Sequence, residues 1–533
     1  MATIPSVEAA GRAGLGRPLR SRTALVLLVA VAATLAYVVW SIHADVRATG
    51  AGPASLVPFV LLFVALLIAL GFEFVNGFHD TANAVATVIY TNALPAHFAV
   101  VWSGVFNFLG VLLSSGAVAF GIISLLPVEL ILRVGSAEGF AMIFALLLAA
   151  IVWNLGTWWL GLPASSSHTL IGSIIGVGVA NSLLSGNGAA GGVDWDQATA
   201  VGKALLLSPL IGFVAAALML LAMKVLVRHK ALYEAPKGQT PPPFWIRALL
   251  IFTCTGVSFT HGSNDGQKGM GLIMLILIGT VPTAYALNRA MPESAVAAFS
   301  VAAEAAVEAI AAGTPGAAPV ADPREAVTRY VETHRLADDT LPALGALIAD
   351  LDRQARSYGA LGAVPAASVS NVRNDMYLAS EAIRRLGKAE AKPLDAGAMA
   401  RLAEFKGLLD QATRFIPLWV KVAVAVALGL GTMVGWKRIV VTVGERIGKS
   451  HMTYAQGASA GLVAMGTIAA ADMYGLPVST TQVLSSGVAG TMAANGSGLQ
   501  AGTVRALLLA WVLTLPAAML LSGLLFWVFH AIF

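Results

Sequence analysis

Charged residues are scarce in this sequence of 533 residues, and their scarcity excludes most soluble folds. Asp, Glu, Lys and Arg make up 11% of the chain, while hydrophobic residues make up 57%. Soluble domains usually carry about 25% charged residues. The composition is therefore typical of an integral membrane protein. The net charge of +5 comes from basic residues in short gaps between apolar runs. That pattern is typical of cytoplasmic loops, and we expect no nucleic-acid partner.

Cysteine and several catalytic motifs are also missing. The one cysteine, Cys254, lies in an apolar run, so no intramolecular disulfide can form. The sequence contains no GxxxxGK[ST] run, so ATP is not expected to be the direct energy source. It contains no HExxH motif either. We therefore expect neither an enzyme nor a cofactor, and an intramembrane enzyme is the weakest alternative.

Apolar runs long enough to cross a bilayer recur along the whole chain. We predict membrane segments at about 24–41, 57–75, 98–125, 139–160, 203–227, 247–260, 269–287, 417–436, 455–471 and 504–530. Two further stretches, 164–184 and 476–494, are short and rich in Gly, Ser and Thr, which indicates re-entrant or broken segments. So many segments favour an all-α, polytopic transporter or a channel.

The first apolar run follows a basic N-terminal tail, residues 1–23. The run at 24–41 is longer than the 7–15 residues of a signal-peptide core. We therefore expect a retained, additional first transmembrane helix whose N-terminus is cytoplasmic.

One long stretch, 283–415, interrupts the apolar pattern. It holds 14 Lys and Arg and 16 Asp and Glu, and it is rich in Ala. We interpret it as a hydrophilic helical insert exposed to water, with a partly disordered loop as the alternative. The sequence leaves its side of the membrane open.

The chain also repeats itself. Residues 74–84 read FVNGFHDTANA and residues 259–269 read FTHGSNDGQKG, an offset of 185. GLPASSSHTL at 161–170 and GLPVSTTQVL at 475–484 match at an offset of 314. The two offsets differ by about the length of the insert, so the second half is the first half with an insert added. Duplication with interrupted helices in corresponding places is typical of secondary transporters.

The repeat divides the chain into predicted units. These are transmembrane repeat 1 at 55–227, a basic cytoplasmic loop at 228–246, the start of repeat 2 at 247–282, the insert, and the remainder of repeat 2 at 416–533.

Each repeat places one aspartate, Asp80 or Asp265, beside an apolar run. A charged Asp at the bilayer centre costs on the order of 3 kcal/mol, so such a residue pairs, binds a cation or lines a wet cavity. The matched context predicts one composite cation site between the repeats, against the alternative of helix caps in loops. The accompanying candidates for this site are Asn76, Asn83, Asn264 and Lys268. Glu73, seven positions before Asp80, is a candidate proton carrier, or a buried residue bonded to a neighbouring helix.

Each repeat also places three hydroxyl residues after Gly-Leu-Pro. Free N–H groups at a helix N-terminus, together with hydroxyl donors, form a cradle for anions. Two such N-termini could hold a tetrahedral oxyanion from both sides, whereas ordinary N-capping would bind nothing. The candidates are Ser165, Ser166, Ser167, Ser479, Thr480 and Thr481.

These motifs resemble the inorganic phosphate transporter (PiT) family, most strongly its bacterial low-affinity branch. The resemblance rests on NGFHDTANAVATVIYT at 76–91, SFTHGSNDGQKGMG at 258–271, GLPASSSHTLIGS at 161–173 and GLPVSTTQVLSSGVAGTM at 475–492. It implies inverted repeats, two re-entrant helical hairpins that hold phosphate, and cations near the aspartate motifs. It also implies cation symport, with metal–phosphate complexes accepted in the bacterial branch and a bacterial inner-membrane location.

The sequence departs from that family at Lys268, where the first repeat has Asn83. An ammonium group there could fill a cation position permanently, so we expect protons to be the coupling ion, with sodium as the alternative. A sulfate or other oxyanion permease of the same fold stays an alternative for the substrate, and an anion channel is a weaker one. The sequence leaves a homodimer open and fixes no metal ligand. Lipid contact follows from the apolar surface.

Overall fold

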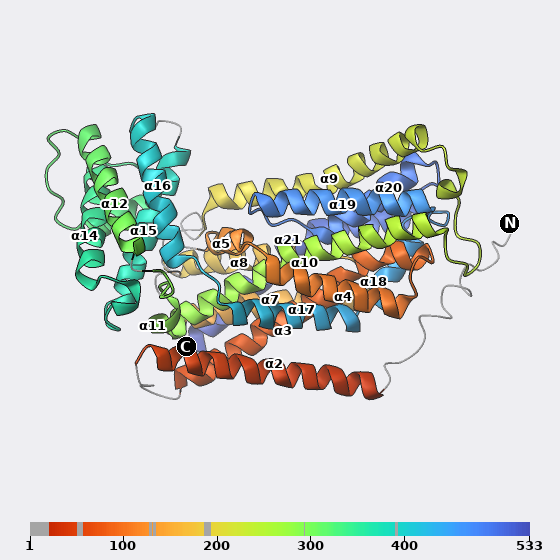
Figure 1. Ribbon diagram of the computed structural model, residues 1–533, viewed down its shortest axis with the longest axis horizontal. Coiled ribbons are helices and arrows are strands. Elements are labelled where there is room, and N and C mark those ends of the chain that lie inside the picture. Colours follow the sequence, from red (N-terminus) through yellow and green to blue (C-terminus); the bar gives the residue numbers. More distant parts are fainter. Residues whose placement is uncertain are drawn as a thin grey trace.

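The computed structural model describes residues 21–50, 57–126, 131, 135–185, 193–292, 294–389 and 393–532. Within these residues the fold is helical, as predicted, and β pairing is limited to one bridge between Gly448 and Leu499. Long helices lie side by side in an elongated bundle, and a second cluster of helices covers one end of it (Figure 1).

The long bundle contains most of the chain. Its helices are α2 (Ser21–Ala48), α3 (Val57–Tyr90), α4 (Ala96–Leu113), α5 (Ala117–Ile123), α7 (Ala137–Trp159), α8 (Ser166–Leu184), α9 (Trp195–Leu226), α10 (Phe244–Thr280), α11 (Pro282–Tyr285), α17 (Leu418–Val434), α18 (Lys437–Val441), α19 (Tyr454–Met473), α20 (Thr480–Ala494) and α21 (Ala501–Ile532).

The surface of this bundle is apolar. Nine helices in the described part of the chain are long and apolar enough to cross a membrane. Large side chains such as Leu206 on α9, Val512 and Leu520 on α21 and Phe252 on α10 are more than half exposed. An outer face of this kind is stable against lipid and not against water. The chain is an integral membrane protein.

Three predicted segments differ from the observed helices. The runs at 247–260 and 269–287 were predicted as separate, but α10 is continuous from Phe244 to Thr280. The polar motif between them stays helical because its side chains find partners on neighbouring helices. The run at 98–125 was predicted as one segment, but it is divided into α4 and α5, with Gly116 at φ 89° between them. Only glycine adopts such a φ without strain.

Four closely packed helix pairs hold the bundle together. Helix α3 packs on α17 and α10 packs on α4, while α8 packs on α21 and α20 packs on α9. A Cβ added at Gly431 of α17 would overlap the Phe74 carbonyl oxygen, and one at Gly110 of α4 would overlap that of Phe259. Phe74 and Phe259 occupy matching positions of the two sequence motifs, and each lies close to a glycine of a neighbouring helix.

The two motif helices run in opposite directions. Past the C-terminal end of α3, the Ala93 carbonyl accepts a hydrogen bond of 2.8 Å from Arg247 Nε, at the N-terminal end of α10. Further along, Gly269 of α10 packs against Glu73, which lies well before the C-terminal end of α3. Helices α3 and α10 are therefore antiparallel at the centre of the bundle.

The close packing at Gly77 predicts how much an added side chain there lowers the free energy of unfolding. A Cβ at Gly77 would overlap the Leu428 carbonyl oxygen, whereas one at Gly71 of the same helix would meet nothing within 4 Å. Gly77→Ala is expected to destabilise the protein by about 1–3 kcal/mol through overpacking. Gly71→Ala should instead stabilise it by about 0.5–1 kcal/mol. Thermal unfolding of both purified variants measures the difference, and equal midpoints would contradict the packing.

The second cluster is built from the predicted insert. It contains α12 (Ser294–Gly313), α13 (Pro323–Thr333), α14 (Thr340–Tyr358), α15 (Val369–Lys388) and α16 (Ala396–Thr413). Helix α12 is apolar enough to be one of the nine membrane-competent helices, yet it packs against α14 and α16 of this cluster. A bend of 72° separates α16 from α17 and divides the cluster from the bundle.

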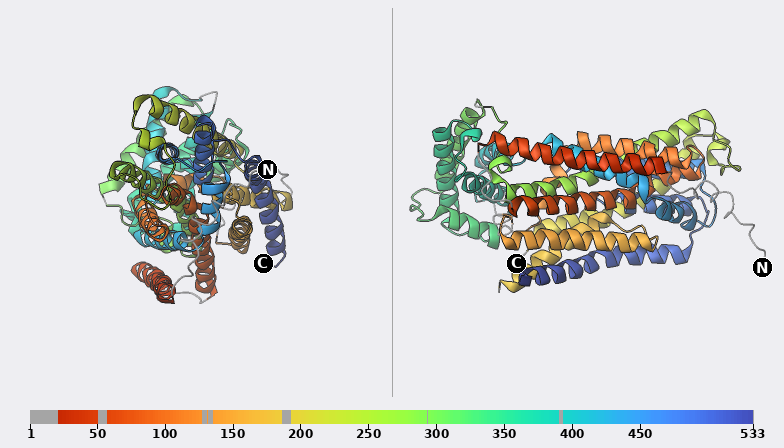
Figure 2. Two further views of the ribbon diagram at one scale, coloured as in Figure 1. Left: turned by 90° about the vertical axis from the view of Figure 1, so that its right-hand side faces the viewer. Right: turned by 90° about the horizontal axis from the view of Figure 1, so that it is seen from below.

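Ion pairs and hydrogen bonds attach the helix cluster and the first helix, α2, to the rest of the bundle. Asp194, at the start of α9, accepts hydrogen bonds of 2.8 Å from Arg384 and 3.0 Å from Arg385 of α15. Asp45 of α2 accepts hydrogen bonds of 2.7 Å from Tyr285 and 3.1 Å from Trp419. Helix α2 lies at the edge of the bundle (Figure 2, left), while the helix cluster covers the end at which α9 begins.

Candidate functional site

The candidate site lies where the centres of α3 and α10 meet the first turns of α8 and α20. Asp80 lies within α3 and Asp265 within α10, and both side chains are buried. Helices α8 and α20 each begin after a short loop that follows another helix, α7 or α19. The alternative that the aspartates cap helices in loops is therefore wrong.

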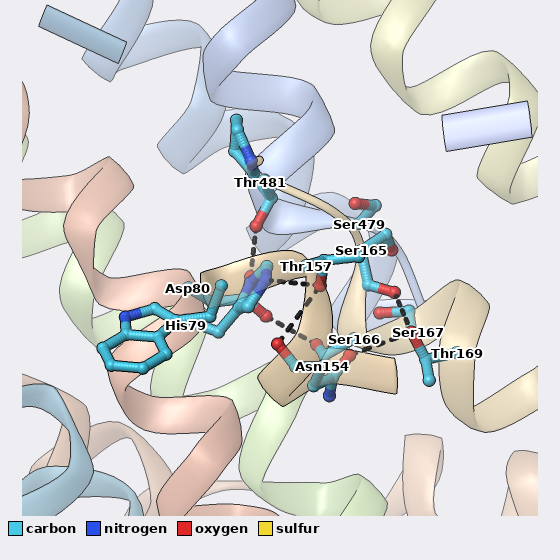
Figure 3. Close-up of polar contacts among 12 residues, drawn as sticks. His79, Asp80, Asn154, Thr157, Ser165, Ser166, Ser167, Thr169, Ser479 and Thr481 are labelled. Atoms are coloured by element: carbon cyan, nitrogen blue, oxygen red, sulfur yellow. Dashed lines mark hydrogen bonds and ion pairs between the residues drawn. The ribbon is translucent and has the colours of Figure 1, made fainter. Parts of the chain in front are cut away.

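The Asp80 carboxylate joins the two hydroxyl clusters. Ser166, the first residue of α8, donates a hydrogen bond of 2.5 Å to Oδ2. Thr481, in the first turn of α20, donates to Oδ1 (Figure 3). His79 Nδ1 lies 3.3 Å from the same Oδ1, and its Nε2 lies 3.2 Å from Thr157 Oγ1. One carboxylate thus holds hydroxyl groups from both halves of the chain.

The second aspartate has a different partner. Lys268 Nζ lies 2.7 Å from Asp265 Oδ1 and donates a hydrogen bond of 2.5 Å to Ser167 Oγ. The Lys268 side chain is fully buried. Ser167 in turn donates to the Val478 carbonyl at 2.7 Å, which connects α8 to the loop before α20. The ammonium group is therefore fixed between the aspartate motif and the first hydroxyl cluster.

Two of the remaining hydroxyl residues accept hydrogen bonds from backbone N–H groups at the start of their own helices. Ser165 accepts a hydrogen bond from the His168 N–H at 3.1 Å, and Ser479 accepts one from the Gln482 N–H at 3.2 Å. Ser165 and Ser479, predicted as phosphate ligands, therefore cap their own helices, as the alternative interpretation of these residues had it. Thr480 Oγ1 is buried and has no hydrogen-bond partner in the described part of the chain. It is free to donate to a bound group.

Asp80, Asp265 and His261 could hold a cation together. One ligand atom from each lies within 4.8 Å of the others, and all three residues are buried. Asp265 Oδ2 and His261 Nε2 lie 3.4 Å apart, and neither has a hydrogen bond to any described residue. Carboxylate oxygen and imidazole nitrogen are donors that transition metals accept, and carboxylate oxygen also suits Mg²⁺. The donor set therefore fits a divalent cation.

The other predicted residues lie around this centre. Asn264 donates to the Leu476 carbonyl at 3.1 Å, which fixes the loop before α20. Asn76 Nδ2 lies 3.5 Å from Glu73 Oε2, and Glu73 packs against Gly269. Glu73 therefore lies beside the Lys268 motif rather than at the hydroxyl clusters. Asn83 belongs to α3, but its side chain lies outside the described residues.

Several polar groups outside the predicted set of residues complete the site. The Oδ1 atom of Asn107, on α4, lies 2.8 Å from Nδ1 of His261. Asp472, at the end of α19, accepts hydrogen bonds from Ser263 at 2.6 Å and Gln267 at 2.7 Å. Thr157 of α7 contacts His79. A single polar residue inside an apolar run was the available signal for Asn107 and Thr157.

A GxSxG sequence, GASAG at 457–461, does not form a nucleophile elbow. That motif works on a sharp turn between a strand and a helix. Here Ser459 lies within α19, where it donates to Met223 Sδ at 3.2 Å. The segment is part of a packed helix and contains no hydrolase site.

Comparisons with known proteins agree with this architecture. Residues 76–522 match the family model described as "Phosphate transporter family". The chain is 43% identical over 485 residues to the low-affinity inorganic phosphate transporter PitA of Escherichia coli, covering 88% of this chain and 96% of PitA. It is 41% identical over 490 residues to PitB of the same organism, with the same coverage.

A solved structure has a related fold. It is described as "The sodium-dependent phosphate transporter" and is 18% identical, with a TM-score of 0.50. The similarity covers 89% of this chain and all of that chain. Taken together with the two aspartate motifs and the two hydroxyl clusters, the match over most of the sequence shows that this chain belongs to the phosphate transporter family.

Proposed function

We propose that this protein imports inorganic phosphate by proton symport through alternating access. The observation that carries the proposal is the contact of Asp80 with Ser166 and Thr481. These hydroxyl groups, which we propose as phosphate ligands, are held by a carboxylate that can take up a proton. The relatives named above, PitA and PitB, are both low-affinity inorganic phosphate transporters.

Competition for hydroxyl donors explains how proton and phosphate binding would be coupled. An ionised carboxylate accepts hydrogen bonds only, and a protonated one also donates. While Asp80 is ionised, it draws Ser166 and Thr481 toward itself. Protonation weakens that attraction and releases both hydroxyl groups, which then join Thr480 and the free N–H groups of two helix N-termini around the anion.

Lys268 is the reason for proposing protons over sodium. Its ammonium group lies 2.7 Å from Asp265, in the place of Asn83 in the first repeat. A fixed positive charge there neutralises one carboxylate, so a sodium ion gains little from binding beside it. The related solved structure is sodium-dependent by description, so sodium coupling is the alternative.

A metal–phosphate complex is the second form of substrate that a specific observation favours. The cluster of Asp80, His261 and Asp265 adjoins the hydroxyl groups because Asp80 belongs to both. A divalent cation carried with phosphate would bind these three side chains in place of the proton on Asp80, while phosphate binds the hydroxyl groups. The metal would then be part of the cargo.

Packing and charge support an inverted repeat in a bacterial inner membrane. Helices α3 and α10 are antiparallel, and their main partners are different helices, α17 for α3 and α4 for α10. The basic loop 228–246 and the basic stretch before α19 lie at the end opposite the helix cluster (Figure 1). The positive-inside rule supports a cytoplasmic location for this end, and the 283–415 insert would then lie outside. The pairs α7–α8 and α19–α20 would be the re-entrant hairpins.

Sulfate competition tests the choice of oxyanion. Hydrogen phosphate can donate a hydrogen bond to a carboxylate, and sulfate cannot. Uptake of radiolabelled phosphate into proteoliposomes is therefore expected to persist in an equal concentration of sulfate, because a lost hydrogen bond costs sulfate about 1–3 kcal/mol, a factor of about 5 to 150 in affinity. Uptake abolished by sulfate would assign the site to that anion. Currents far above carrier turnover would assign it to a channel.

A further inference from the structure

A cavity of about 260 Å³ lies between the helix cluster and the long bundle. It is far from Asp80 along the bundle, at the end of α10 and the start of α7. Gly279 of α10, Ser136 before α7 and Ser370, Arg373 and Asn374 of α15 are among its lining residues. None of the described residues that line it is acidic.

Arg373 is the charged group of this cavity. Its side chain is 6% exposed, and its guanidinium lies 5.2 Å from the centre of the Tyr377 ring. Nη1 donates to the Ile131 carbonyl at 3.4 Å and to Asn374 Oδ1 at 3.2 Å. Nε has no hydrogen-bond partner among the described residues, and no described carboxylate forms an ion pair with Arg373.

The positive charge of Arg373 is retained at neutral pH. Burial lowers the pKa of Arg373 to about 10, and the positive charge of Arg414 acts in the same direction. A pKa of that size leaves the guanidinium protonated. A buried charge without a counter-ion is costly, and guanidinium donors match phosphate oxygens in a bidentate geometry.

A helix N-terminus adds further donors at the same place. Helix α15 is 20 residues long, and Ser368 at its N-cap position makes no side-chain capping bond. The first N–H groups of such a helix lack intrahelical partners and attract anions. Ser370, in the first turn, brings a hydroxyl donor to the cavity wall.

We infer that this cavity is a second oxyanion site, which binds a phosphate group through Arg373, Ser370 and the start of α15. The group belongs either to free inorganic phosphate or to the headgroup of an anionic phospholipid. This site does not depend on the proposed transport function, because it shares no residue with the hydroxyl clusters. It would tie the insert to α7 and α10, which lead to the candidate transport site.

Ser370→Glu tests the site without removing Arg373. A glutamate three residues before Arg373 can pair with it within the helix, and an acid in the first turn suits the helix dipole, so the variant should fold. Ser370→Gln is the neutral control of the same size. Arg373→Gln removes the charge, and its control is Arg401→Gln on the exposed face of α16.

The assay measures phosphate and lipid bound to the purified full-length protein. Equilibrium dialysis with radiolabelled phosphate counts free phosphate, and native mass spectrometry detects retained phospholipid. We expect Ser370→Glu and Arg373→Gln to weaken binding of one of these about tenfold or more, because a charge-assisted contact is lost. Ser370→Gln, which loses only a neutral hydroxyl contact, should weaken binding less than Ser370→Glu does, and Arg401→Gln should match the wild type. The species lost identifies the source of the phosphate group.

Equal binding of phosphate and phospholipid by all four variants and the wild type would overturn the inference. In that case Arg373 would serve only to pack α15 against the bundle. A loss of binding in Ser370→Glu would support the second site. If the wild type at the same time transported no phosphate, only the proposed function would be overturned.

Discussion

Lys268→Asn is expected to reduce proton-driven phosphate uptake about a hundredfold or more in sodium-free buffer. The substitution leaves the Asp265 carboxylate buried without its ammonium partner, and breaking a buried ion pair costs about 3–5 kcal/mol. A change of about 1.4 kcal/mol is a factor of ten. Initial rates in proteoliposomes with an inward proton gradient measure the loss.

Sodium should restore part of that uptake. Asparagine at position 268 recreates the pattern of the first repeat, in which a carboxylate and an amide can accept a small cation. Lys224→Asn, on the exposed face of α9, is the control and should transport as the wild type does. Undiminished sodium-free uptake by Lys268→Asn would show that the ammonium group does not substitute for a cation.

Asp80→Asn is expected to abolish accumulation of phosphate against its gradient while leaving phosphate exchange. The asparagine oxygen can still accept a hydrogen bond from one of Ser166 and Thr481, and its amide N–H can donate to the hydroxyl oxygen of the other, so the helix ends keep their positions. The amide takes up no proton, so the link between the proton gradient and the hydroxyl groups is lost. Net uptake and counterflow, measured on the same proteoliposomes, separate the two effects.

Asp45→Asn is the matched control for that experiment. Asp45 accepts hydrogen bonds from Tyr285 and Trp419 far from the hydroxyl clusters, and asparagine can accept them too. Both net uptake and exchange should match the wild type. Accumulation by Asp80→Asn equal to that of Asp45→Asn would remove Asp80 from the coupling mechanism.

The sequence was informative about the site because the repeat marked it twice. The matched positions of Asp80 and Asp265, and of the two hydroxyl clusters, predicted residues that the fold brings together. Periodicity was less informative about helix boundaries, since the apolar run of α10 is interrupted by polar residues that remain helical. A hydrophobic run marks a helix that is exposed to lipid. The polar residues of α10 contact other helices instead, so hydrophobicity does not show that they are helical.

Asymmetry between the halves was the hardest feature to predict. Asp80 bonds to hydroxyl groups of both α8 and α20, whereas Asp265 bonds to Lys268. The substitution of lysine for asparagine was visible in the sequence, but its reach to Ser167 depends on how α10 lies against α8. Asn107 has no repeat partner that would have marked it, and only its packing reveals its role.

Proton-driven uptake without sodium tests the central claim most directly. Radiolabelled phosphate is added to proteoliposomes in sodium-free buffer, with and without an inward proton gradient. The account predicts uptake above the equilibrium level that requires the gradient and collapses when a protonophore is added. Uptake that is absent until sodium is supplied would contradict proton coupling through Asp80 and would return the site to sodium.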